Sequence, residues 1–530
     1  MKITKKKVRI VVTKLILISA ALFLLSPRLG LGQSVQHLSI TQPGGLPGQP
    51  VLTGILSGTN GVTVTWDGPS GYYQLFEKRS LSESVWKSLG PRTNLVRRAF
   101  VTGASSNALF RVLGPAPHFV GSRACIECHQ TIHDTVMSTL HAQAFSALQQ
   151  IHQDTNPSCL ACHTVGFGAP SGFISAAATP QLEGVQCENC HGPAGNHAAN
   201  PDDPTARPRL EIAAQVCGGC HTGSHQPTFE EWRSSAHSGV VEDLNSTNVI
   251  ESCGRCHSGS VRWSLLEGKP LPVGDANLGI QCINCHEPHS KTANPHQLLN
   301  PVASTKDYSL STSDVFTNKY DPSINICAQC HNHRGAAWTI SSRPPHHSPQ
   351  YNMLLGTVGV LDTGLPPNQP ASHALRIKDQ CVGCHMQSTN YVSEAQPANT
   401  GHNFAVQSFD VCQACHNLPG PLVDFTTTTI SNKVQSIKAN LDLWATTKAP
   451  SSLVVKYGAR AWEYSNPGDL SPGGTGPSST EQALIPVVIQ KARFNLYLVL
   501  YDGSYGVHNA RFAVTLLDTA QNWVDTELNK

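Results

Sequence analysis

Residues 125–129 read CIECH, and the same pattern, Cys-x-x-Cys-His, recurs eight more times up to residue 416. The other copies are CLACH at 159, CENCH at 187, CGGCH at 217, CGRCH at 253, CINCH at 282, CAQCH at 327, CVGCH at 381 and CQACH at 412. This pattern is the attachment signature of c-type haem: both cysteines form thioethers with the porphyrin, and the histidine ligates the iron. The nine motifs therefore predict nine covalently attached haem c groups.

Other uses of paired cysteines explain the pattern less well. A disulfide framework has no need of a histidine after every second cysteine, and zinc ribbons use CxxC pairs without it. With 25 histidines among 530 residues, chance does not place one after nine of nine pairs. The predicted attachment residues are all 18 cysteines of the chain: Cys125, Cys128, Cys159, Cys162, Cys187, Cys190, Cys217, Cys220, Cys253, Cys256, Cys282, Cys285, Cys327, Cys330, Cys381, Cys384, Cys412 and Cys415. The predicted proximal iron ligands are His129, His163, His191, His221, His257, His286, His331, His385 and His416.

Composition and charge agree with a chain that packs around porphyrin. Aromatic residues make up 6% and charged residues 14% of the sequence, which contains 43 glycines and 36 prolines. We therefore expect the motif region to be rich in loops, with short helices. The net charge of +2 gives no reason to expect a nucleic-acid partner. Haem propionates, about two per haem, would make the surface of the loaded protein more negative.

The segment 1–32 has the pattern of a signal peptide. A basic start with Lys2 and Lys5–Lys7 precedes an apolar stretch over positions 15–25, and Gly30-Leu31-Gly32, with glycines at positions 30 and 32, suits a cleavage site. An uncleaved anchor is the alternative. Because c-type haem is attached outside the cytoplasm, this segment predicts an exported protein, periplasmic or secreted.

Residues 38–115 contain no cysteine and predict a small β-sandwich of fibronectin-like type. Val62, Val64 and Trp66 alternate with polar residues, as do Tyr73 and Leu75, and turn-forming residues separate the runs. The domain is interpreted as a spacer, with a binding module as the alternative. His37 precedes it and is not expected to be a ligand.

The motifs fall into three groups of three, and the first two groups form an internal repeat over residues 118–300. The motifs of the first group begin at positions 125, 159 and 187, and those of the second begin at 217, 253 and 282, so the two sets of spacings are nearly equal. GVQCENCH at 184–191 matches GIQCINCH at 279–286, and the flanking sequences place His141 opposite His237. The third group, residues 301–420, has motifs at positions 327, 381 and 412, and its wider first spacing makes it a diverged copy or a separate module.

Residues 421–530 lack cysteine and predict long helices packed on the last haems. Ile430, Val434, Ile437, Leu441 and Trp444 share one helical face, and this helix should end before residue 450. Two further helices are expected over about 483–501 and 509–528. The predicted fold is therefore mixed: a small β-sandwich, a loop-rich haem-binding region with short helices, and long C-terminal helices.

Sixteen histidines lie outside the motifs, which is enough for a second ligand on every iron. Neutral imidazole is the common sixth ligand of low-spin haem, and Met137, Met353 and Met386 are alternatives. The distal candidates are His133, His141, His197, His237, His296, His346, His373, His402 and His508, with His118, His152, His225, His289, His333 and His347 in reserve.

These motifs and their contexts resemble one superfamily of multihaem cytochromes. It includes the tetrahaem cytochrome of ammonia oxidisers, hydroxylamine oxidoreductase and pentahaem nitrite reductase. CIECH followed by STLHAQAF, CLACHTVGFG and GVQCENCHGPAGNH resembles the first three sites of the tetrahaem type, which implies ligand roles for His141 and His197. CVGCHMQ, GHNF, CQACH and YGVHNARFAVTLL resemble the closing sites of the nitrite reductases, which implies such roles for His402 and His508.

The departures from that superfamily bear on function. No motif ends in lysine, as the catalytic site of pentahaem nitrite reductase does, and no spacing marks a tyrosine for the cross-link of hydroxylamine oxidoreductase. The leading hypothesis is an electron carrier without substrate chemistry, working with other cytochromes or a membrane quinol oxidoreductase. The alternatives are a reductase or oxidase of the nitrite or hydroxylamine type, which acts on a small nitrogen or sulfur oxyanion at one open iron, and a structural, self-associating cytochrome. Arg334, Arg343 and Lys491 are candidate anion-binding residues for the enzyme.

Overall fold

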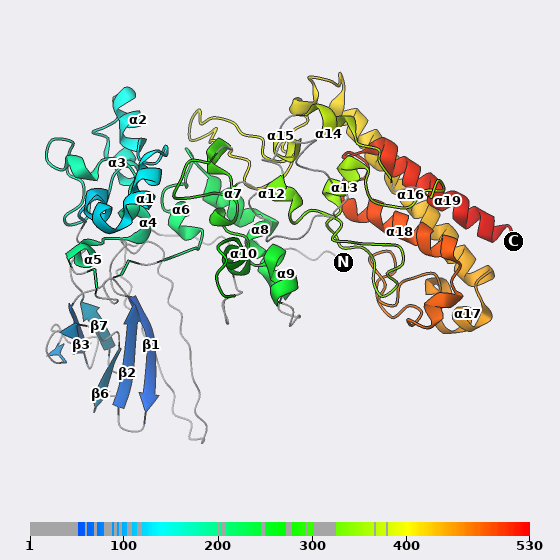
Figure 1. The fold of residues 1–530 in the computed structure, drawn as a ribbon, viewed down its shortest axis with the longest axis horizontal. Coiled ribbons are helices and arrows are strands. Elements are labelled where there is room, and N and C mark those ends of the chain that lie inside the picture. Colours follow the sequence, from blue (N-terminus) through cyan, green and yellow to red (C-terminus); the bar gives the residue numbers. More distant parts are fainter. Residues whose placement is uncertain are drawn as a thin grey trace, which may run out of the picture. The chain divides into compact units, whose positions relative to one another are not determined.

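The computed structural model describes strands between residues 51 and 113 and most of residues 119–530 (Figure 1). The predicted signal peptide, His37 and His118 lie outside the described residues. The described ranges are 51–58, 61–67, 72–78, 87–89, 93–94, 98–102, 109–113, 119–199, 201–202, 207–208, 210–244, 250–271, 278–292, 295–299, 325–364, 367–377 and 380–530.

The chain divides into two compact units. The first comprises Met1–Cys128 and Ala144–Leu210, and the second comprises His129–Gln143 and Glu211–Lys530. The first unit therefore holds the cysteines of the first three motifs, and the second unit holds the other six motifs and the C-terminal helices. The segment predicted as one pair of repeats, 118–300, is split between them. No helix in the described ranges is both long and apolar enough to cross a bilayer.

The N-terminal strands pair into two antiparallel sheets. Val64 and Trp66, two residues apart on one strand, are both buried, as alternation predicts. One sheet has the order β1-β2-β6, and in the other β3 pairs with β4, β5 and β7. Whether these sheets form a fibronectin-like sandwich stays a prediction. The strands are β1 Val51–Gly58, β2 Gly61–Asp67, β3 Tyr72–Lys78, β4 Lys87–Ser88, β5 Thr93–Asn94, β6 Arg98–Thr102 and β7 Leu109–Leu113.

The first motif group consists of short helices joined by loops. Asn156 caps one of them by accepting a hydrogen bond from the Ser158 N–H at 3.0 Å, and Pro157 occupies its first position. A small apolar core that includes Phe145 and Leu182 lies between these helices. The elements are η1 Ser122–Cys125, α1 Ile126–Met137, α2 Ala144–Gln150, α3 Pro157–His163, η2 Pro180–Leu182, α4 Cys187–His191 and α5 Gly195–Ala199.

The second and third groups are built in the same way. Trp232 anchors the second group by donating its indole N–H to the Ile280 carbonyl at 2.8 Å, and Tyr351 and Leu355 belong to a small core of the third. The second group contains α6 Gln215–Gly218, α7 Thr228–Ser234, α8 Ala236–Gly239, η4 Val240–Leu244, α9 Ile250–His257, α10 Gly259–Leu266, η5 Cys282–Asn284 and η6 Pro295–Gln297. The third contains α12 Asn325–Ala328, α13 Gln350–Leu355, α14 Ser372–Arg376, α15 Gln380–His385 and η9 Asp410–Cys412.

The largest apolar core belongs to the C-terminal helices. The longest three, α16, α18 and α19, lie side by side (Figure 1). The predicted stripe from Ile430 to Trp444 is buried on α16, and Tyr497 is fully buried on α18. The starts of α18 and α19 lie within a few residues of the predicted positions, and α16 ends at Thr447, before residue 450. The elements are α16 Pro419–Thr447, α17 Ser451–Tyr457, η10 Gly458–Arg460, η11 Glu481–Leu484, α18 Val487–Asp502 and α19 Ala510–Leu528.

Within each of the first two motif groups, an equivalent hydrogen bond links the third motif to the first. The Gln186 side chain accepts from the Ser122 N–H at 2.6 Å, and Gln281 accepts from the Ala214 N–H at 2.7 Å. Ser122 and Ala214 both lie three residues before the first cysteine of their group. Each glutamine thus ties the third motif of its group to the first, as expected if the groups are copies of one unit.

A second matched pair of bonds ties the third motif of each group to the second. Asn189 donates its side-chain N–H to the Thr164 carbonyl at 2.9 Å, and Asn284 donates to the Gly259 carbonyl at 3.0 Å. Both asparagines lie inside the CxNC sequence of the third motif. The repeat found in the sequence is therefore also a repeat of the bonds that hold the motifs in place.

Candidate functional site

Each motif forms a short helical turn. The backbone N–H of the motif histidine donates to the carbonyl of the first cysteine at 2.9 Å in the motifs at 217, 282, 327 and 412. Residues four apart on such a turn share a face, and so do residues three apart. Both cysteines and the histidine therefore point to the same side, as attachment of one haem requires.

Six motif histidines face a histidine from elsewhere in the chain. The distance between the two ring centroids is 5.8–6.3 Å in every pair. Two metal–imidazole bonds of about 2 Å each, together with the rings themselves, account for a spacing of about 6 Å. Each pair therefore leaves room for one iron. The pairs are His221–His141, His331–His237, His257–His346, His286–His402, His416–His373 and His385–His508.

His141 and His237 occupy matching places in these pairs. His141 follows the first motif of the first group and faces His221, which belongs to the first motif of the second group. His237 follows the first motif of the second group and faces His331, which belongs to the first motif of the third. Each therefore reaches from its own group to the motif that opens the next one.

In seven of the twelve paired histidines a hydrogen bond holds one ring nitrogen, Nδ1. Nδ1 of His286 lies 2.8 Å from the His296 carbonyl, and Nδ1 of His385 lies 3.0 Å from the Phe404 carbonyl. The other contacts are His373 to Val507 O, His402 to Thr400 O, His346 to Ser348 Oγ, His257 to Asp243 Oδ2 and His508 to Asp502 Oδ1. Such bonds fix the ring orientation and leave the other nitrogen, Nε2, for a metal.

Most of the paired rings are held in the neutral state. Burial, followed by the nearby His331 ring, lowers the pKa of His237 to about 4. Burial, followed by the charge of Arg334, lowers the pKa of His346 to about 4. Burial also lowers the pKa values of His141 and His402. A neutral imidazole has the nitrogen lone pair that binds iron, so these rings are ready to act as ligands.

The other distal candidates stand apart from these six pairs. His133 lies on α1 with its Nδ1 3.2 Å from Asp134 Oδ1, and His197 lies on α5. His296 is exposed, and its backbone carbonyl, rather than its ring, contacts Nδ1 of His286. The ligand roles of His133, His197 and His296 stay predictions. His133 and His197 would serve the first group, whose predicted proximal ligands are His129, His163 and His191.

Two reserve histidines contact tyrosines rather than motif histidines. The His225 ring stacks on Tyr391 with 3.7 Å between centroids, and the His347 ring stacks on Tyr501 at 3.6 Å. The other reserves have different surroundings: His152 is exposed, His289 lies 3.6 Å from Glu287 and His333 lines a pocket. Met353, one of the alternative ligands, is buried in the core of the C-terminal helices.

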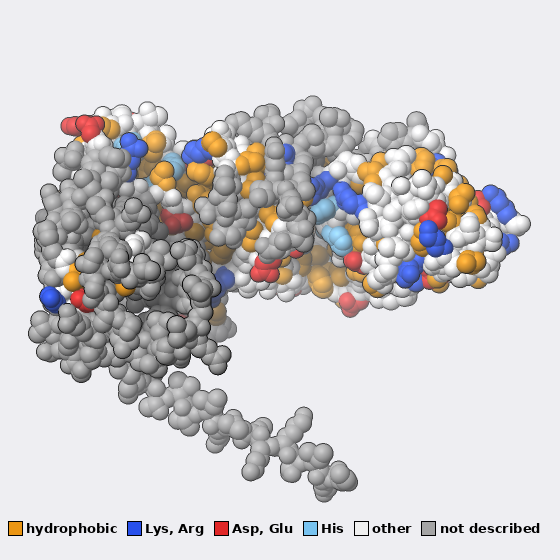
Figure 2. Space-filling view, turned by 90° about the horizontal axis from the view of Figure 1, so that it is seen from below, with side chains coloured by type: hydrophobic (Ala, Val, Ile, Leu, Met, Phe, Trp, Pro, Cys, Tyr) orange, Lys and Arg blue, Asp and Glu red, His pale blue; other side chains and the backbone are white. Residues whose placement is uncertain are grey.

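Apolar side chains near the motifs remain on the surface of the polypeptide. Leu140 is 78% exposed, and Leu418 and Phe425, which flank the last motif, are each 70% exposed. Hydrophobic side chains also lie open on the face drawn in Figure 2. Such exposure is costly unless something covers it. A porphyrin attached to the adjoining cysteines fits this requirement.

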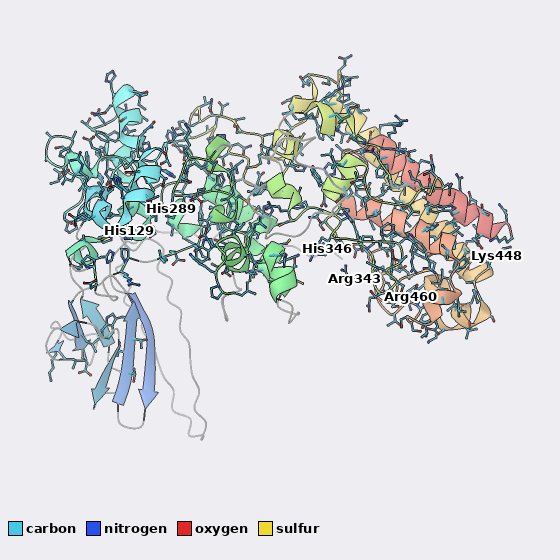
Figure 3. All side chains as sticks on the ribbon, in the orientation of Figure 1. His129, His289, Arg343, His346, Lys448 and Arg460 are labelled. Atoms are coloured by element: carbon cyan, nitrogen blue, oxygen red, sulfur yellow. The ribbon has the colours of Figure 1, made fainter. Side chains whose placement is uncertain are left out.

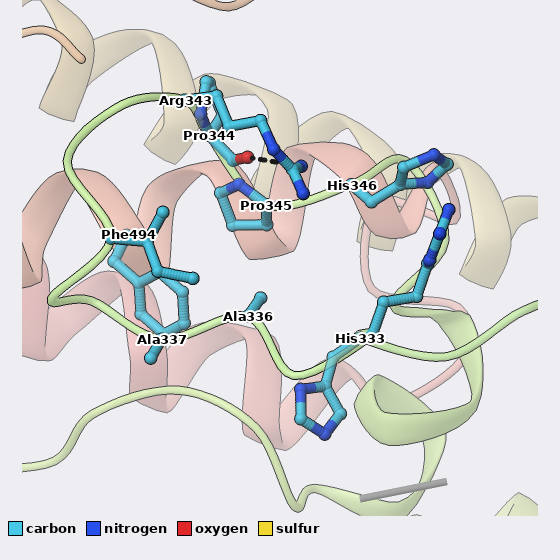
Figure 4. Close-up of a pocket in the computed structure, with 10 residues that line it drawn as sticks. His333, Ala336, Ala337, Arg343, Pro344, Pro345, His346 and Phe494 are labelled. Carbon is cyan, nitrogen blue, oxygen red and sulfur yellow. Dashed lines mark hydrogen bonds between the residues drawn. The ribbon is translucent and has the colours of Figure 1, made fainter. Parts of the chain in front are cut away.

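A pocket beside His346 carries positive charge (Figure 4). It is lined by His333, Arg334, Arg343, His346 and Phe494, among others. Arg343 and His346, labelled in Figure 3, lie on the segment between α12 and α13. The sequence predicted the two arginines as anion-binding residues, and their charge suits a haem propionate or a small oxyanion.

Comparisons with known proteins agree with the haem-attachment motifs. Residues 124–192 match the family model described as cytochrome c554 and c-prime. The chain is 29% identical to the multiheme cytochrome MtrA of Shewanella baltica and 32% identical to cytochrome c-554 of Nitrosomonas europaea. The chain belongs to the multihaem c-type cytochromes. Covalently attached haem c is accordingly its cofactor.

These matches cover parts of the chains. The MtrA match covers 33% of this cytochrome and 52% of MtrA, and the cytochrome c-554 match covers 31% and 66%. The chain thus spans about half to two thirds of the length of these relatives.

The solved outer cell wall cytochrome OcwA matches over 77% of this chain and 99% of its own, with a TM-score of 0.54 and 19% identity. The undecaheme cytochrome from the S-layer of Carboxydothermus ferrireducens has a TM-score of 0.51, also at 19% identity, over 78% of this chain and 70% of its own. Both structures share the fold.

The sequence did not reveal the groups that hold the distal histidines. Glu231 accepts hydrogen bonds from the backbone N–H groups of Thr400 and His402, both at 2.9 Å, and so fixes the loop that carries His402. Asp502 holds His508. Asp502 could have been suspected from its place, at the end of an apolar helix and six residues before a predicted ligand.

Proposed function

We propose that this cytochrome is an exported nonahaem electron carrier whose irons have two histidine ligands each. The six histidine pairs at 5.8–6.3 Å are the observation that carries the proposal. Iron held by two imidazoles takes up and releases an electron without exchanging a ligand. An arrangement in which both axial positions are filled suits electron transfer and disfavours substrate binding.

Contacts between attachment cysteines of different motifs support a continuous path. The thiols of Cys125 and Cys187 are hydrogen-bonded, as are those of Cys217 and Cys282, so the first and third motifs touch in both repeated groups. Groups attached at such neighbouring sulfurs lie close together, which suits electron transfer between them.

Cysteines of different motifs also interact in the second and third groups. Cys256 is hydrogen-bonded to Cys330, and Cys327 to Cys381. Cys384 and Cys412 lie close enough to interact. The motifs at 253, 327, 381 and 412 are thus linked in turn through their cysteines. This continuity favours a conduit over separate, independent haem sites.

The pocket with Arg334 and Arg343 favours the enzyme alternative. If His346 left its place opposite His257, an oxyanion could reach the iron while these arginines bound its charge. The closed spacing of that pair, 5.8 Å between centroids, makes the carrier the stronger proposal.

Export and partners follow from the proposed role. The N-terminal segment 1–32 would direct the chain to the periplasm or beyond, and OcwA is named an outer cell wall cytochrome. Other cytochromes or a membrane quinol oxidoreductase would exchange electrons with it. The strands of residues 51–113 would serve as a spacer or a site of self-association.

A reductive titration tests the proposal. The oxidised protein is expected to take up nine electrons per chain, because nine motifs each supply one haem. Stepwise addition of a low-potential reductant, followed by haem absorbance, measures this number, and the intact mass gives the haem count independently. Uptake of six or fewer electrons per chain would refute a nonahaem carrier. The Cys412→Ser, Cys415→Ser variant is the matched control and should take up one electron less.

A further inference from the structure

Two of the paired histidines bind a carboxylate through Nδ1. Asp502 Oδ1 lies 2.7 Å from Nδ1 of His508, and Asp243 Oδ2 lies 3.0 Å from Nδ1 of His257. The other paired histidines with an Nδ1 contact named above use a backbone carbonyl or a hydroxyl instead. A negative charge at Nδ1 makes the imidazole a stronger donor to a metal bound at the opposite nitrogen.

The two carboxylates differ in burial. The side chain of Asp502 is 2% exposed, whereas that of Asp243 is 65% exposed. Water screens the charge of Asp243, while the charge of Asp502 acts through a medium of low dielectric constant. Asp502 is therefore the stronger electrostatic partner.

The end of helix α18 fixes Asp502 in this position. Gly503 ends the helix with a φ of 72°, a left-handed conformation that glycine adopts without strain. The Ser504 hydroxyl then donates to Oδ2 of Asp502 and accepts from the His508 N–H at 3.2 Å. One carboxylate oxygen is thus held by Ser504 and the other by His508. The carboxylate is preorganised and does not turn away when the charge of its surroundings changes.

We propose that Asp502 is a positioning residue that gives the haem attached to Cys381 and Cys384 the lowest reduction potential in the chain. The inference rests on the proposed pairing of His508 with His385, whose ring centroids lie 6.2 Å apart. Oxidation of the iron adds one positive charge, which the buried carboxylate stabilises through His508. Loss of an electron from this site is favoured over loss from sites whose ligands bind neutral groups. The site would then pass electrons to its neighbour at Cys327, which contacts Cys381.

Spectroelectrochemical titration of Asp502→Asn tests the proposal. Asparagine keeps the shape and the acceptor oxygen but removes the charge. The equilibrium constant for reducing the lowest-potential one-electron component should rise at least tenfold. This corresponds to an increase of about 59 mV in its reduction potential. Asp502→Glu should keep a low-potential component. Asp243→Asn is the matched control, because it removes an equivalent but hydrated carboxylate, and it should produce a smaller shift.

An unchanged titration of Asp502→Asn, or an equal or larger shift in Asp243→Asn, would overturn the proposal. His508→Met gives a second, independent reading, since methionine ligation raises the potential of the haem concerned. The lowest-potential component should then disappear; its persistence would place the lowest potential elsewhere and refute the assignment. The spin state of the wild-type protein distinguishes failure of the proposed role of Asp502 from failure of the proposed carrier function. Fully low-spin iron without the predicted shift refutes only the role of Asp502, whereas an open iron in the wild type refutes the carrier itself.

Discussion

Replacing His237 with alanine is expected to convert one haem iron of the chain from low-spin to high-spin. His237 faces His331 with 6.1 Å between ring centroids, and its lowered pKa keeps it neutral and able to bind iron. Phe404 packs against the same ring with 4.4 Å between centroids, so an apolar side chain covers that side of His237. Electron spin resonance of the oxidised variant should show one new high-spin signal, and the reduced variant should bind one carbon monoxide per chain.

His225→Ala is the matched control for this prediction. His225 is also a non-motif histidine of the second group, but its ring stacks on Tyr391. Its removal should leave every iron low-spin. Added imidazole should restore the low-spin spectrum of His237→Ala, which would show that the variant is folded. A low-spin His237→Ala protein, or a high-spin signal in His225→Ala, would contradict the assigned pairs.

Arg493→Met is expected to destabilise the C-terminal helices by about 3–5 kcal/mol, the usual cost of breaking a buried charge network by removing one partner. Arg493 is fully buried and donates to the carbonyls of Trp462 and Glu463 at 2.8 and 2.7 Å. It also donates to Gln482 Oε1 at 2.8 Å. Methionine fills similar space but leaves these acceptors, and the buried Glu463 carboxylate, without the guanidinium.

Hydrogen exchange of peptides from α18 measures this loss. Protection should fall roughly 100- to 3,000-fold, since each 1.4 kcal/mol corresponds to a factor of ten. Lys433→Met is the control, because Lys433 pairs with Asp518 at 2.6 Å on the surface, where both side chains are at least 39% exposed. Exposed pairs contribute about 0–1 kcal/mol. Comparable losses of protection in the two variants would show that the buried network of Arg493 contributes no more to stability than the exposed ion pair of Lys433.

The residues that attach haem could be predicted from the sequence because their geometry is local. Two cysteines and a histidine within five residues form one helical turn wherever the chain places them. The apolar stripe of α16 was also predictable, since Ile430, Val434 and Ile437 recur at helical spacing and are buried. The repeat was visible in the sequence and recurs in the bonds of Gln186 and Gln281.

The pairing of ligands could not be predicted in this way. His346 is remote in sequence from His257, and His508 is more remote still from His385, so only the folded chain brings them together. His133 and His225 each lie eight residues after the first cysteine of their group. Equal spacing nevertheless did not reveal that the His225 ring stacks on Tyr391. The groups that tune the ligands, such as Asp502, belong to no motif and are recognised only through contact distance and burial.

Quantitative electron spin resonance of the oxidised wild-type protein tests the central claim most directly. All nine proposed irons should integrate as low-spin, and titration with nitrite and sulfite should leave the spectrum unchanged, because the proposal places a histidine at both axial positions of each iron. A high-spin signal that disappears on addition of either anion, together with turnover of that anion, would contradict the account and identify the protein as an enzyme.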